Sequence, residues 1–338
     1  MSYEISPLIK EKAPLILAEI KKANSILLHC HPSPDPDSVC SALAMKFAVE
    51  QFGKKATIIK GDSEIPEAFM HFPGAKEIVM KSYWEIDPSQ YDLFIVVDSA
   101  ITGVSRIKEV SLPSTMKVIN IDHHRTNTGS GSINIVDPTY PATGQLLFDV
   151  LGEMKIKITP EIAINLFAGI ITDTGGFKFE STTANTFEVA AQLVKIVPDF
   201  GKYIAEMENS NTLSDMMFHG LALSSIETFS NGKLAISAVP YYLIEEKKIL
   251  SVSTSAGTIS SILRTVAQFE IMVACIETKP NQIRLSFRTR DAQKYDVSKI
   301  AALFGGGGHI VASGATLNMT LDEAKKLVVA KVKELYNL

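Results

Sequence analysis

The chain has 338 residues, of which 46% are hydrophobic and 21% are charged, and its formal net charge is −4. This length suits two domains of ordinary size, and the hydrophobic fraction gives each of them enough apolar side chains for a core. The composition therefore excludes a disordered chain, and the slight negative charge argues against a protein that coats duplex DNA.

The cysteines and the N-terminus indicate the compartment. Cys30, Cys40 and Cys275 are too few and too dispersed for a disulfide scaffold or a zinc ribbon, which favours a reducing environment. Charges interrupt the apolar positions of residues 1–23, so this segment predicts an amphipathic helix and not a signal peptide. No apolar run approaches the roughly 18 residues of a membrane span. We therefore expect a soluble, cytoplasmic protein with no membrane partner.

The first half of the chain predicts a parallel β-sheet. Short apolar segments rich in β-branched residues alternate with helical stretches, a pattern typical of parallel strands buried on both faces. Three of these segments end in acidic or histidine residues, and the site of an open α/β sheet lies at the carboxyl ends of its strands. The segments are residues 25–29, 55–61, 91–98 and 117–124.

The rest of the chain predicts two helices, followed by a second group of strands. A nearly all-apolar helix opens with the capping sequence Thr-Pro-Glu and ends at Asp173, and a second helix is stopped by Pro198. The last third predicts strands and a final helix that begins with a capping box, Thr320 to Glu323. We expect an α/β fold with a parallel-sheet domain (1–190), a helical linker (191–225) and a smaller α/β domain (226–338). The late strands are expected at residues 232–240, 270–277 and 281–290.

Acidic and imidazole side chains gather where the apolar segments end. Four or more carboxylates cannot share one cleft in ionised form without a counter-charge, so the pattern predicts two divalent cations. An oxygen-rich ligand set with a minority of imidazole favours Mn²⁺ or Mg²⁺ over zinc. Paired metals activate a water and stabilise a phosphoryl displacement. The residues are His31, Asp35, Asp37, Asp98, Asp122, His123, His124 and Asp173.

A glycine-rich segment near the C-terminus predicts a second binding element. Four consecutive glycines, Gly305, Gly306, Gly307 and Gly308, precede His309. Such a run is costly in chain entropy, and a backbone without Cβ atoms can offer its N–H groups to an anion. Arg288, on a predicted strand, can form a forked pair with phosphate, and its neighbours Arg284 and Arg290 are alternatives.

Five motifs occur in the order HPSPDPDS, VVDSA, DHH, DTGGF and FGGGGHIVASG. In this order they resemble the DHH phosphoesterase superfamily with its DHH-associated C-terminal domain, over nearly the whole chain. The length and the lack of further domains are similar to the NrnA type. Its members are manganese-dependent oligoribonucleases and phosphatases of 3′-phosphoadenosine-5′-phosphate.

The resemblance implies two metal sites that share Asp98. Asp122 would orient a ligand and His124 would face the reacting phosphate, so both are expected to act in catalysis. The implied ligands of one metal are His31, Asp35 and Asp98, and those of the other are Asp37, Asp98, His123 and Asp173. The implied contacts to the substrate's other phosphate are Arg288, Gly305, Gly306, Gly307, Gly308 and His309.

Two positions depart from the family pattern. Cys40 stands where relatives generally have glycine, and Gly176 stands where many have arginine. Neither is an implied metal ligand, so these departures bear on substrate preference and not on the metal site.

The resemblance implies a hydrolase that cleaves short oligoribonucleotides to mononucleotides and dephosphorylates adenosine 3′,5′-bisphosphate. Its cofactor would be two Mn²⁺ ions, with Mg²⁺ and Co²⁺ as alternatives. Its partners would be short single-stranded oligonucleotides or nucleotide bisphosphates and not duplex DNA, and a homodimer is left open. Two other functions stay open: a phosphodiesterase for cyclic di-AMP or its linear product, and a nucleotide-binding regulator whose catalysis has decayed.

Overall fold

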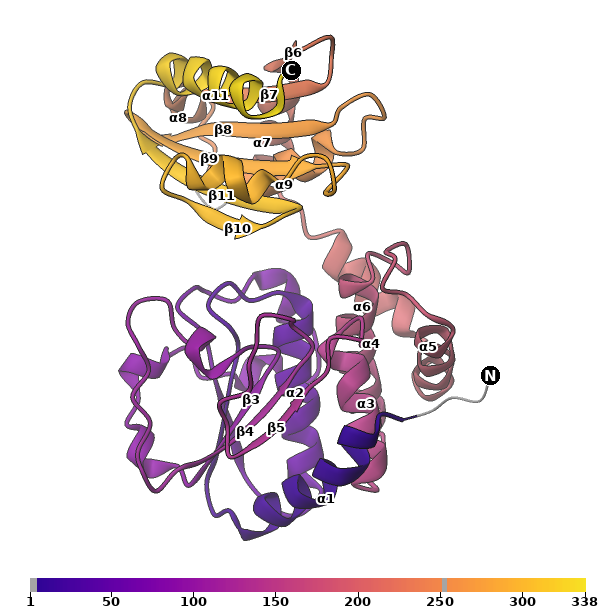
Figure 1. The fold of residues 1–338 in the computed structure, drawn as a ribbon. Helices are drawn as coiled ribbons and strands as arrows, with labels where there is room; N and C mark the ends of the chain where they lie inside the picture. Colours follow the sequence, from indigo (N-terminus) through magenta and orange to yellow (C-terminus); the bar gives the residue numbers. More distant parts are fainter. Residues whose placement is uncertain (1–4, 251–253) are drawn as a thin grey trace. The chain divides into compact units, whose positions relative to one another are not determined.

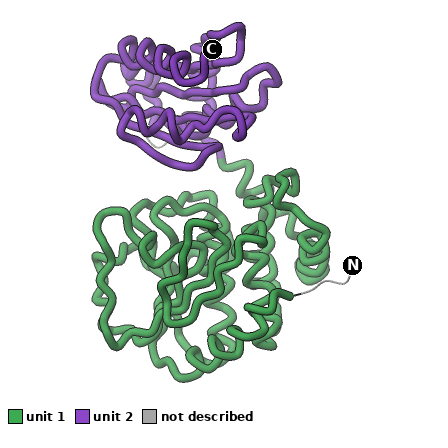
Figure 2. Tube along the Cα trace, viewed as in Figure 1, with its two compact units in different colours: residues 1–210 green, residues 211–338 purple. Residues whose placement is uncertain are grey.

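The computed structural model describes residues 5–250 and 254–338 and divides the chain into two compact units, residues 1–210 and 211–338 (Figure 2). The boundary falls inside the segment 191–225 that the sequence predicts to be a helical linker. The segment contains the end of α5 (Ala184–Ile196) and all of α6 (Phe200–Glu208), which lie in unit 1, and α7 (Leu213–Ser224), which lies in unit 2.

Unit 1 is built on a parallel sheet with the strand order β2-β1-β3-β4-β5. Strands β3, β4 and β5 are labelled in Figure 1. Every residue of β1 and β3 is buried, which explains why their sequences are continuously apolar and do not alternate. The predicted parallel sheet is confirmed, and β5 is an addition to it. The strands are β1 Ile26–His29, β2 Ala56–Ile59, β3 Leu93–Val97, β4 Lys117–Asp122 and β5 Ile133–Val136.

Helices cover one face of this sheet, and Figure 1 shows α1, α3 and α4 gathered on one side of the strands. Side chains from the segment 79–116, including Tyr83 and Ile101, pack on the other face. The strand order reverses between β1 and β3, and at such a reversal the carboxyl ends of the strands leave a crevice for a ligand. The helices are α1 Pro7–Lys22, α2 Pro36–Glu50, α3 Thr143–Glu153, α4 Pro160–Asp173 and α5 Ala184–Ile196.

Unit 2 contains a mixed sheet with the strand order β10-β11-β9-β8-β7-β6, in which β7 and β8 are parallel. The strands expected at residues 232–240, 270–277 and 281–290 correspond to β7, β8 and β9. The final helix has the expected capping box, because Thr320 and Glu323 each accept the other's backbone N–H. The strands are β6 Ile226–Phe229, β7 Leu234–Val239, β8 Ile271–Lys279, β9 Gln282–Thr289, β10 Gly307–His309 and β11 Ala312–Asn318, and the remaining helices are α8 Tyr241–Glu246, α9 Ala256–Leu263, α10 Val297–Ala302 and α11 Leu321–Tyr336.

Several general properties of the surface and the cysteines follow from the described residues. None of the helices among them is both long and apolar enough to cross a bilayer. The three cysteines are unpaired and buried, where each acts as a small apolar side chain.

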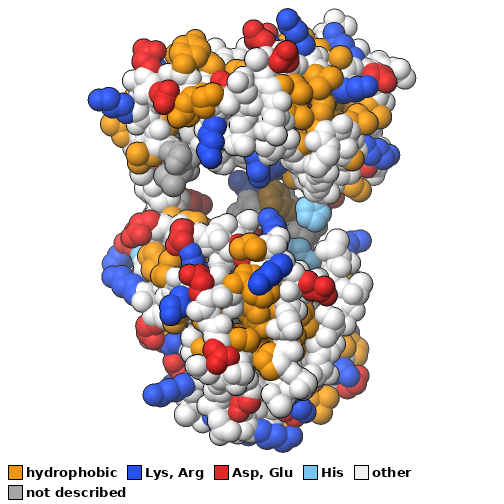
Figure 3. All heavy atoms as spheres, turned by 90° about the vertical axis from the view of Figure 1, so that its left-hand side faces the viewer, with side chains coloured by type: hydrophobic (Ala, Val, Ile, Leu, Met, Phe, Trp, Pro, Cys, Tyr) orange, Lys and Arg blue, Asp and Glu red, His pale blue; other side chains and the backbone are white. Residues whose placement is uncertain are grey.

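The face drawn in Figure 3 carries basic and acidic side chains in mixture, so it offers no extended basic surface for coating a nucleic acid.

Candidate metal centre

The candidate site lies at the carboxyl edge of the unit 1 sheet. His31 and Asp35 follow β1, Asp98 follows β3, and Asp122 is the last residue of β4, directly before His123. Parallel strands end at the same edge, so residues far apart in the sequence meet there. The structure brings together all the predicted metal and catalytic residues of this unit, including His124 and Asp173.

The first group consists of His31, Asp35 and Asp98. The Nε2 atom of His31 lies 3.2 Å from Oδ2 of Asp35 and 3.6 Å from Oδ2 of Asp98. Asp35 caps α2 by accepting the backbone N–H of Ser38 at 2.9 Å through Oδ1, which leaves Oδ2 for the group. The Asp35 side chain is 49% exposed and that of Asp98 is 2% exposed, so the group opens to solvent on the Asp35 side.

The second group consists of Asp37, His123 and Asp173. Nε2 of His123 lies 3.3 Å from Asp173 Oδ2 and 3.9 Å from Asp37 Oδ2, and Asp98 Oδ1 is 3.6 Å away. This buried nitrogen makes no hydrogen bond within the described part of the chain. Nδ1 of the same ring donates to the carbonyl oxygen of Tyr140 at 3.3 Å, so the ring in its neutral form carries its lone pair on Nε2. An unpaired buried nitrogen surrounded by carboxylates is suited to a cation.

The separations between these atoms fit divalent cations. In an octahedral site with bonds of about 2.1 Å, neighbouring ligand atoms lie about 3 Å apart. The nitrogen–oxygen distances in the two groups run from 3.2 to 3.9 Å. Asp98 turns Oδ2 toward His31 and Oδ1 toward His123, so one carboxylate is placed to bridge two cations.

The charges of the cluster are uncompensated without a cation. Burial, followed by the charges of Asp37 and Asp35, raises the pKa of Asp98 well above its ordinary value. Burial and the charge of Asp173 raise the pKa of Asp37 to about 7. Burial lowers the pKa of His123, but Asp173 and Asp37 outweigh it and raise this pKa to about 9. Protons therefore relieve part of the repulsion, and a bound cation would replace them.

Asp37 is held by the beginning of α3. Its Oδ2 accepts the backbone N–H of Thr143 at 2.7 Å, and its Oδ1 accepts that of Gly144 at 2.9 Å. The N-cap residue of α3, Ala142, has no side chain able to cap, so Asp37 satisfies these N–H groups from another helix. The hydroxyl of Thr143 also donates to Asp98 Oδ1 at 2.9 Å. One helix terminus thus orients two carboxylates of the site.

Asp122 and His124 form a separate pair beside the two groups. Asp122 is fully buried and accepts His124 Nδ1 at 2.7 Å through Oδ1 and Asn127 Nδ2 at 2.7 Å through Oδ2. Burial alone would raise the pKa of Asp122, but the hydrogen bond from His124 lowers it overall. The same hydrogen bond raises the pKa of His124. The His124 ring is 43% exposed, and the hydrogen bond to Asp122 uses its Nδ1 and not its Nε2.

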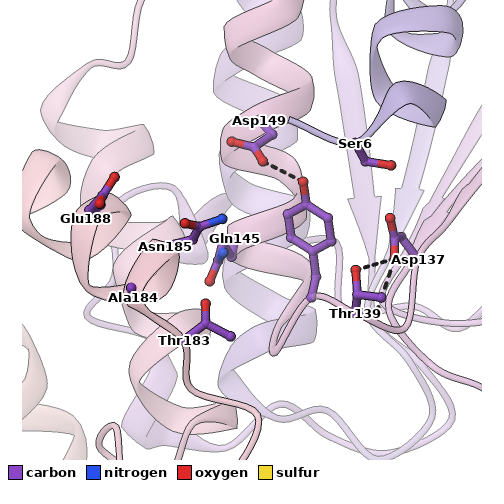
Figure 4. Close-up of a pocket in the computed structure, with 10 residues that line it drawn as sticks. Ser6, Asp137, Thr139, Gln145, Asp149, Thr183, Ala184, Asn185 and Glu188 are labelled. Carbon is purple, nitrogen blue, oxygen red and sulfur yellow. Dashed lines mark hydrogen bonds between the residues drawn. The ribbon is translucent and has the colours of Figure 1, made fainter. Parts of the chain in front are cut away.

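Tyr140, whose carbonyl oxygen accepts the His123 N–H, is itself held by a residue of α3. The Tyr140 hydroxyl donates to Oδ2 of Asp149 at 2.6 Å, and Asp149 is 2% exposed (Figure 4). These two residues line a pocket of about 780 Å³, together with Asp137, Thr139 and Gln145. The carbonyl that orients the His123 ring therefore belongs to a residue whose own side chain is fixed.

Gly169 is a part of the site that no sequence motif marked. A Cβ atom at this position in α4 would lie 2.2 Å from Asp37 Oδ1. Gly169→Ala is therefore expected to displace the Asp37 carboxylate and to weaken cation binding by about 10- to 100-fold, the usual effect of disturbing a ligand's surroundings. Calorimetric titration with Mn²⁺ measures this change. Gly152→Ala, in α3 with nothing within 4 Å of the new atom, is the matched control. An unchanged affinity in Gly169→Ala would show that Asp37 relaxes in place.

In unit 2, His309 and Arg288 lie on the same face of the sheet. The strand register pairs His309 with Ala312 and Ala312 with Arg288, and directly paired residues project to the same side. His309 is exposed and Arg288 is partly buried. Burial, and then the charge of Arg264, lower the pKa of Arg288. Their binding role stays a prediction.

Of the two alternative arginines, Arg290 has a structural role. Its guanidinium donates to the carbonyl oxygens of Arg264, Val266 and Phe269 at 2.7 to 3.1 Å. Arg284 is exposed.

The glycine run has a packing explanation in part. A Cβ atom at Gly306 would lie 2.1 Å from the carbonyl oxygen of Gly314, and one at Gly308 would lie 2.6 Å from that of Ala312. Gly305 adopts a φ of +70°, and at Gly307 a Cβ would meet open space. Close approach to β11 therefore accounts for two of the four glycines, and the run alone does not indicate a ligand.

Comparison with known proteins gives matches along the whole chain. The model of the DHH family, N-terminal domain, matches residues 25–170, and that of the DHHA1 domain matches residues 232–337. The bifunctional oligoribonuclease and PAP phosphatase NrnA of Thermus thermophilus is 30% identical over 325 residues, which cover 94% of this chain and 93% of the relative.

Two solved structures share the fold. An exopolyphosphatase-related protein from Bacteroides fragilis superposes with a TM-score of 0.88 at 21% identity, covering 100% of this chain and 99% of that one. RecJ from Thermus thermophilus in complex with Mn²⁺ superposes with a TM-score of 0.57 at 14% identity, covering 99% of this chain and 55% of that one.

Proposed function

Because this chain belongs to the DHH family and carries a DHHA1 domain, we propose that it is a metal-dependent phosphoesterase for short oligoribonucleotides and adenosine 3′,5′-bisphosphate. The Thermus thermophilus relative is named for these two activities, and the match spans nearly all of both chains. The observation that carries the proposal is Asp98, whose two carboxylate oxygens face two different groups of candidate ligands.

We assign the cofactor as two Mn²⁺ ions, with Mg²⁺ and Co²⁺ as alternatives. Carboxylate oxygens with a minority of imidazole suit Mn²⁺, and a RecJ structure of the same fold contains this ion. When bound, such ions lower the pKa of a water and neutralise charge on the phosphate. The proposed ligands are His31, Asp35 and Asp98 in one group and Asp37, Asp98, His123 and Asp173 in the other.

The residues around the metal ligands would hold protons and orient the substrate. Asp122 fixes the His124 ring through Nδ1 and raises its pKa, so a protonated Nε2 can donate to the reacting phosphate or to the leaving oxygen. In unit 2, Arg288 and His309 are proposed to hold the substrate's second phosphate with the loop Gly305–Gly308. Their position on one face of the sheet supports this assignment.

The proposal is tested by assaying the purified protein with Mn²⁺ on three substrates. The substrates are a 5′-phosphorylated dinucleotide RNA, adenosine 3′,5′-bisphosphate and cyclic di-AMP, and the products are separated by chromatography. We expect mononucleotides from the first and AMP with phosphate from the second. Turnover of cyclic di-AMP alone would replace the proposal with a cyclic-dinucleotide phosphodiesterase. Tight nucleotide binding without turnover in Mn²⁺, Co²⁺ or Mg²⁺ would indicate a regulator.

A further inference from the structure

An exposed arginine, Arg106, is hydrogen-bonded both to the loop after β1 that carries two candidate metal ligands and to a neighbouring aspartate. Nη1 of Arg106 donates to the hydroxyl of Ser33 at 3.2 Å. Ser33 lies between His31 and Asp35 in the chain, so the guanidinium is attached to the loop that carries two candidate metal ligands. The backbone N–H of Arg106 donates to Oδ2 of Asp62 at 2.6 Å, and this fixes the start of the side chain as well.

The backbone around Arg106 is held by a network of polar side chains. Ser105 is 5% exposed, and its hydroxyl donates to Oδ1 of Asp62 at 2.9 Å. The Ser105 hydroxyl oxygen in turn accepts the indole N–H of Trp84 at 2.8 Å. The ammonium group of Lys108 lies 4.0 Å from the centre of the Trp84 ring, a cation–π contact. We name Trp84, Ser105 and Asp62 the Arg106 support.

The Arg106 support is itself fixed to the metal-binding loop. The backbone N–H of Ser63 donates to the carbonyl oxygen of Pro32 at 3.1 Å. Gly61 packs so closely that a Cβ atom there would lie 2.4 Å from the carbonyl oxygen of His31. The turn that carries Asp62 is therefore held against the segment that follows β1. These contacts fix the turn that carries Asp62 relative to His31. Because Asp62 binds the backbone N–H of Arg106, they also fix the backbone of Arg106.

The guanidinium group of Arg106 keeps unused hydrogen-bond donors in the described part of the chain. No carboxylate forms an ion pair with its guanidinium within residues 5–250 and 254–338. Asp62, the acid of the support, instead accepts from a backbone N–H and a hydroxyl. A guanidinium has five N–H donors, and the hydrogen bond to Ser33 uses one of them. An unpaired guanidinium held at a centre that acts on phosphate esters is suited to a phosphate oxygen.

We propose that Arg106 is a substrate-binding residue that donates to a phosphate oxygen of the nucleotide at the metal centre. Ser33 and the Arg106 support are positioning residues for it. The inference rests on the proposed function for the identity of the substrate, but the anion contact itself does not require turnover. Its charge would also offset the repulsion between the phosphate and the carboxylates of the site.

The first test compares Arg106→Gln and Arg106→Lys with the wild-type protein on the dinucleotide. Losing a hydrogen bond to a charged group should lower kcat/KM by about 10- to 100-fold in Arg106→Gln. Arg106→Lys should recover only part of this, because an ammonium cannot form the forked contact. Lys55→Gln removes one positive charge just before β2, at the opposite edge of the sheet, and should leave kcat/KM unchanged. Mn²⁺ content and Tm should stay at wild-type values in every variant.

The second test measures binding without catalysis. AMP and adenosine are titrated by calorimetry into the Mn²⁺-loaded proteins, and only AMP binding should weaken in Arg106→Gln. Asp62→Ala should reproduce part of this loss, and Asp62→Asn, which keeps an acceptor for the Arg106 N–H, should restore it. AMP affinity within twofold of wild type in Arg106→Gln would overturn the proposal, as would a loss of metal or of Tm. If the wild-type protein binds AMP through Arg106 but cleaves no dinucleotide, the proposed function fails and this contact stands.

Discussion

Asp98→Asn should abolish phosphoesterase activity and the binding of both cations together. The two oxygens of Asp98 face separate ligand groups, so no other single side chain of the cluster belongs to both in the same way. Asparagine keeps the size of the side chain and tolerates the φ of +55° at this position, so the backbone should not change. Removing a single hydrogen-bond donor that stabilises a transition state lowers kcat by about 10²- to 10³-fold. The loss of two cations should cost more, so we expect kcat to fall by about 10³-fold or more.

Metal analysis by mass spectrometry and thermal unfolding separate this effect from misfolding. Burial and neighbouring acids raise the pKa of Asp98 in the folded state, so its ionisation destabilises the metal-free fold at neutral pH. Metal-free Asp98→Asn should therefore have a Tm equal to or above that of the metal-free wild type, and added Mn²⁺ should no longer raise it. Asp92→Asn, at the amino end of the same strand, is the matched control and should keep both cations. Two bound cations in Asp98→Asn would refute the bridge.

The affinity for Mn²⁺ should rise steeply with pH. Metal ligands must be deprotonated, and in the metal-free protein the pKa of Asp37 is raised to about 7 and that of His123 to about 9. Between these values the cation must displace the proton of His123, and below the lower value it must displace that of Asp37 as well. The association constant should therefore increase about tenfold per pH unit for each proton released, across roughly pH 6.5 to 8.5.

Calorimetry in two buffers of different ionisation enthalpy counts the released protons directly. At pH 8 we expect the wild-type protein to release about one proton more than His123→Gln, and at pH 6.5 the proton of Asp37 is released as well. In His123→Gln the site is weakened, and any protons still released above pH 7 come from its carboxylates. A constant affinity over this range would show that the carboxylates and His123 are not protonated in the absence of metal.

Strands β1 to β4 of unit 1 were predictable because nearly all their residues are buried and their sequences are therefore nearly continuous in apolar residues. The segments 25–29, 55–61, 91–98 and 117–124 contain β1 to β4, and the polar residues after them lie at the predicted edge. Strand β5 was not predicted, because Ile133–Val136 is short and only one of its residues is buried. In unit 2, β6, β10 and β11 were not predicted, for the related reason that their exposed residues dilute the apolar pattern.

Helix α3 shows why local sequence cannot reveal every element. Its N-cap is Ala142, which has no capping group, so the usual signal for a helix start is absent. The cap is supplied by Asp37, 106 residues away in the chain. The same contact explains why Thr143, Gly144 and Gly169 could not be recognised as parts of the site. Thr143 and Gly144 orient the Asp37 carboxylate, and Gly169 leaves space for it. Only the folded chain shows that these residues contact Asp37.

The chain contains a single tryptophan, and that residue is Trp84 of the Arg106 support. Its indole N–H is bound to Ser105, and the Lys108 ammonium lies 4.0 Å from the ring. Because the chain has no other tryptophan, tryptophan fluorescence of this protein reports on one location only. The emission of the native protein is thus a built-in optical reporter for the neighbourhood of Arg106, and it needs no dye or engineered label.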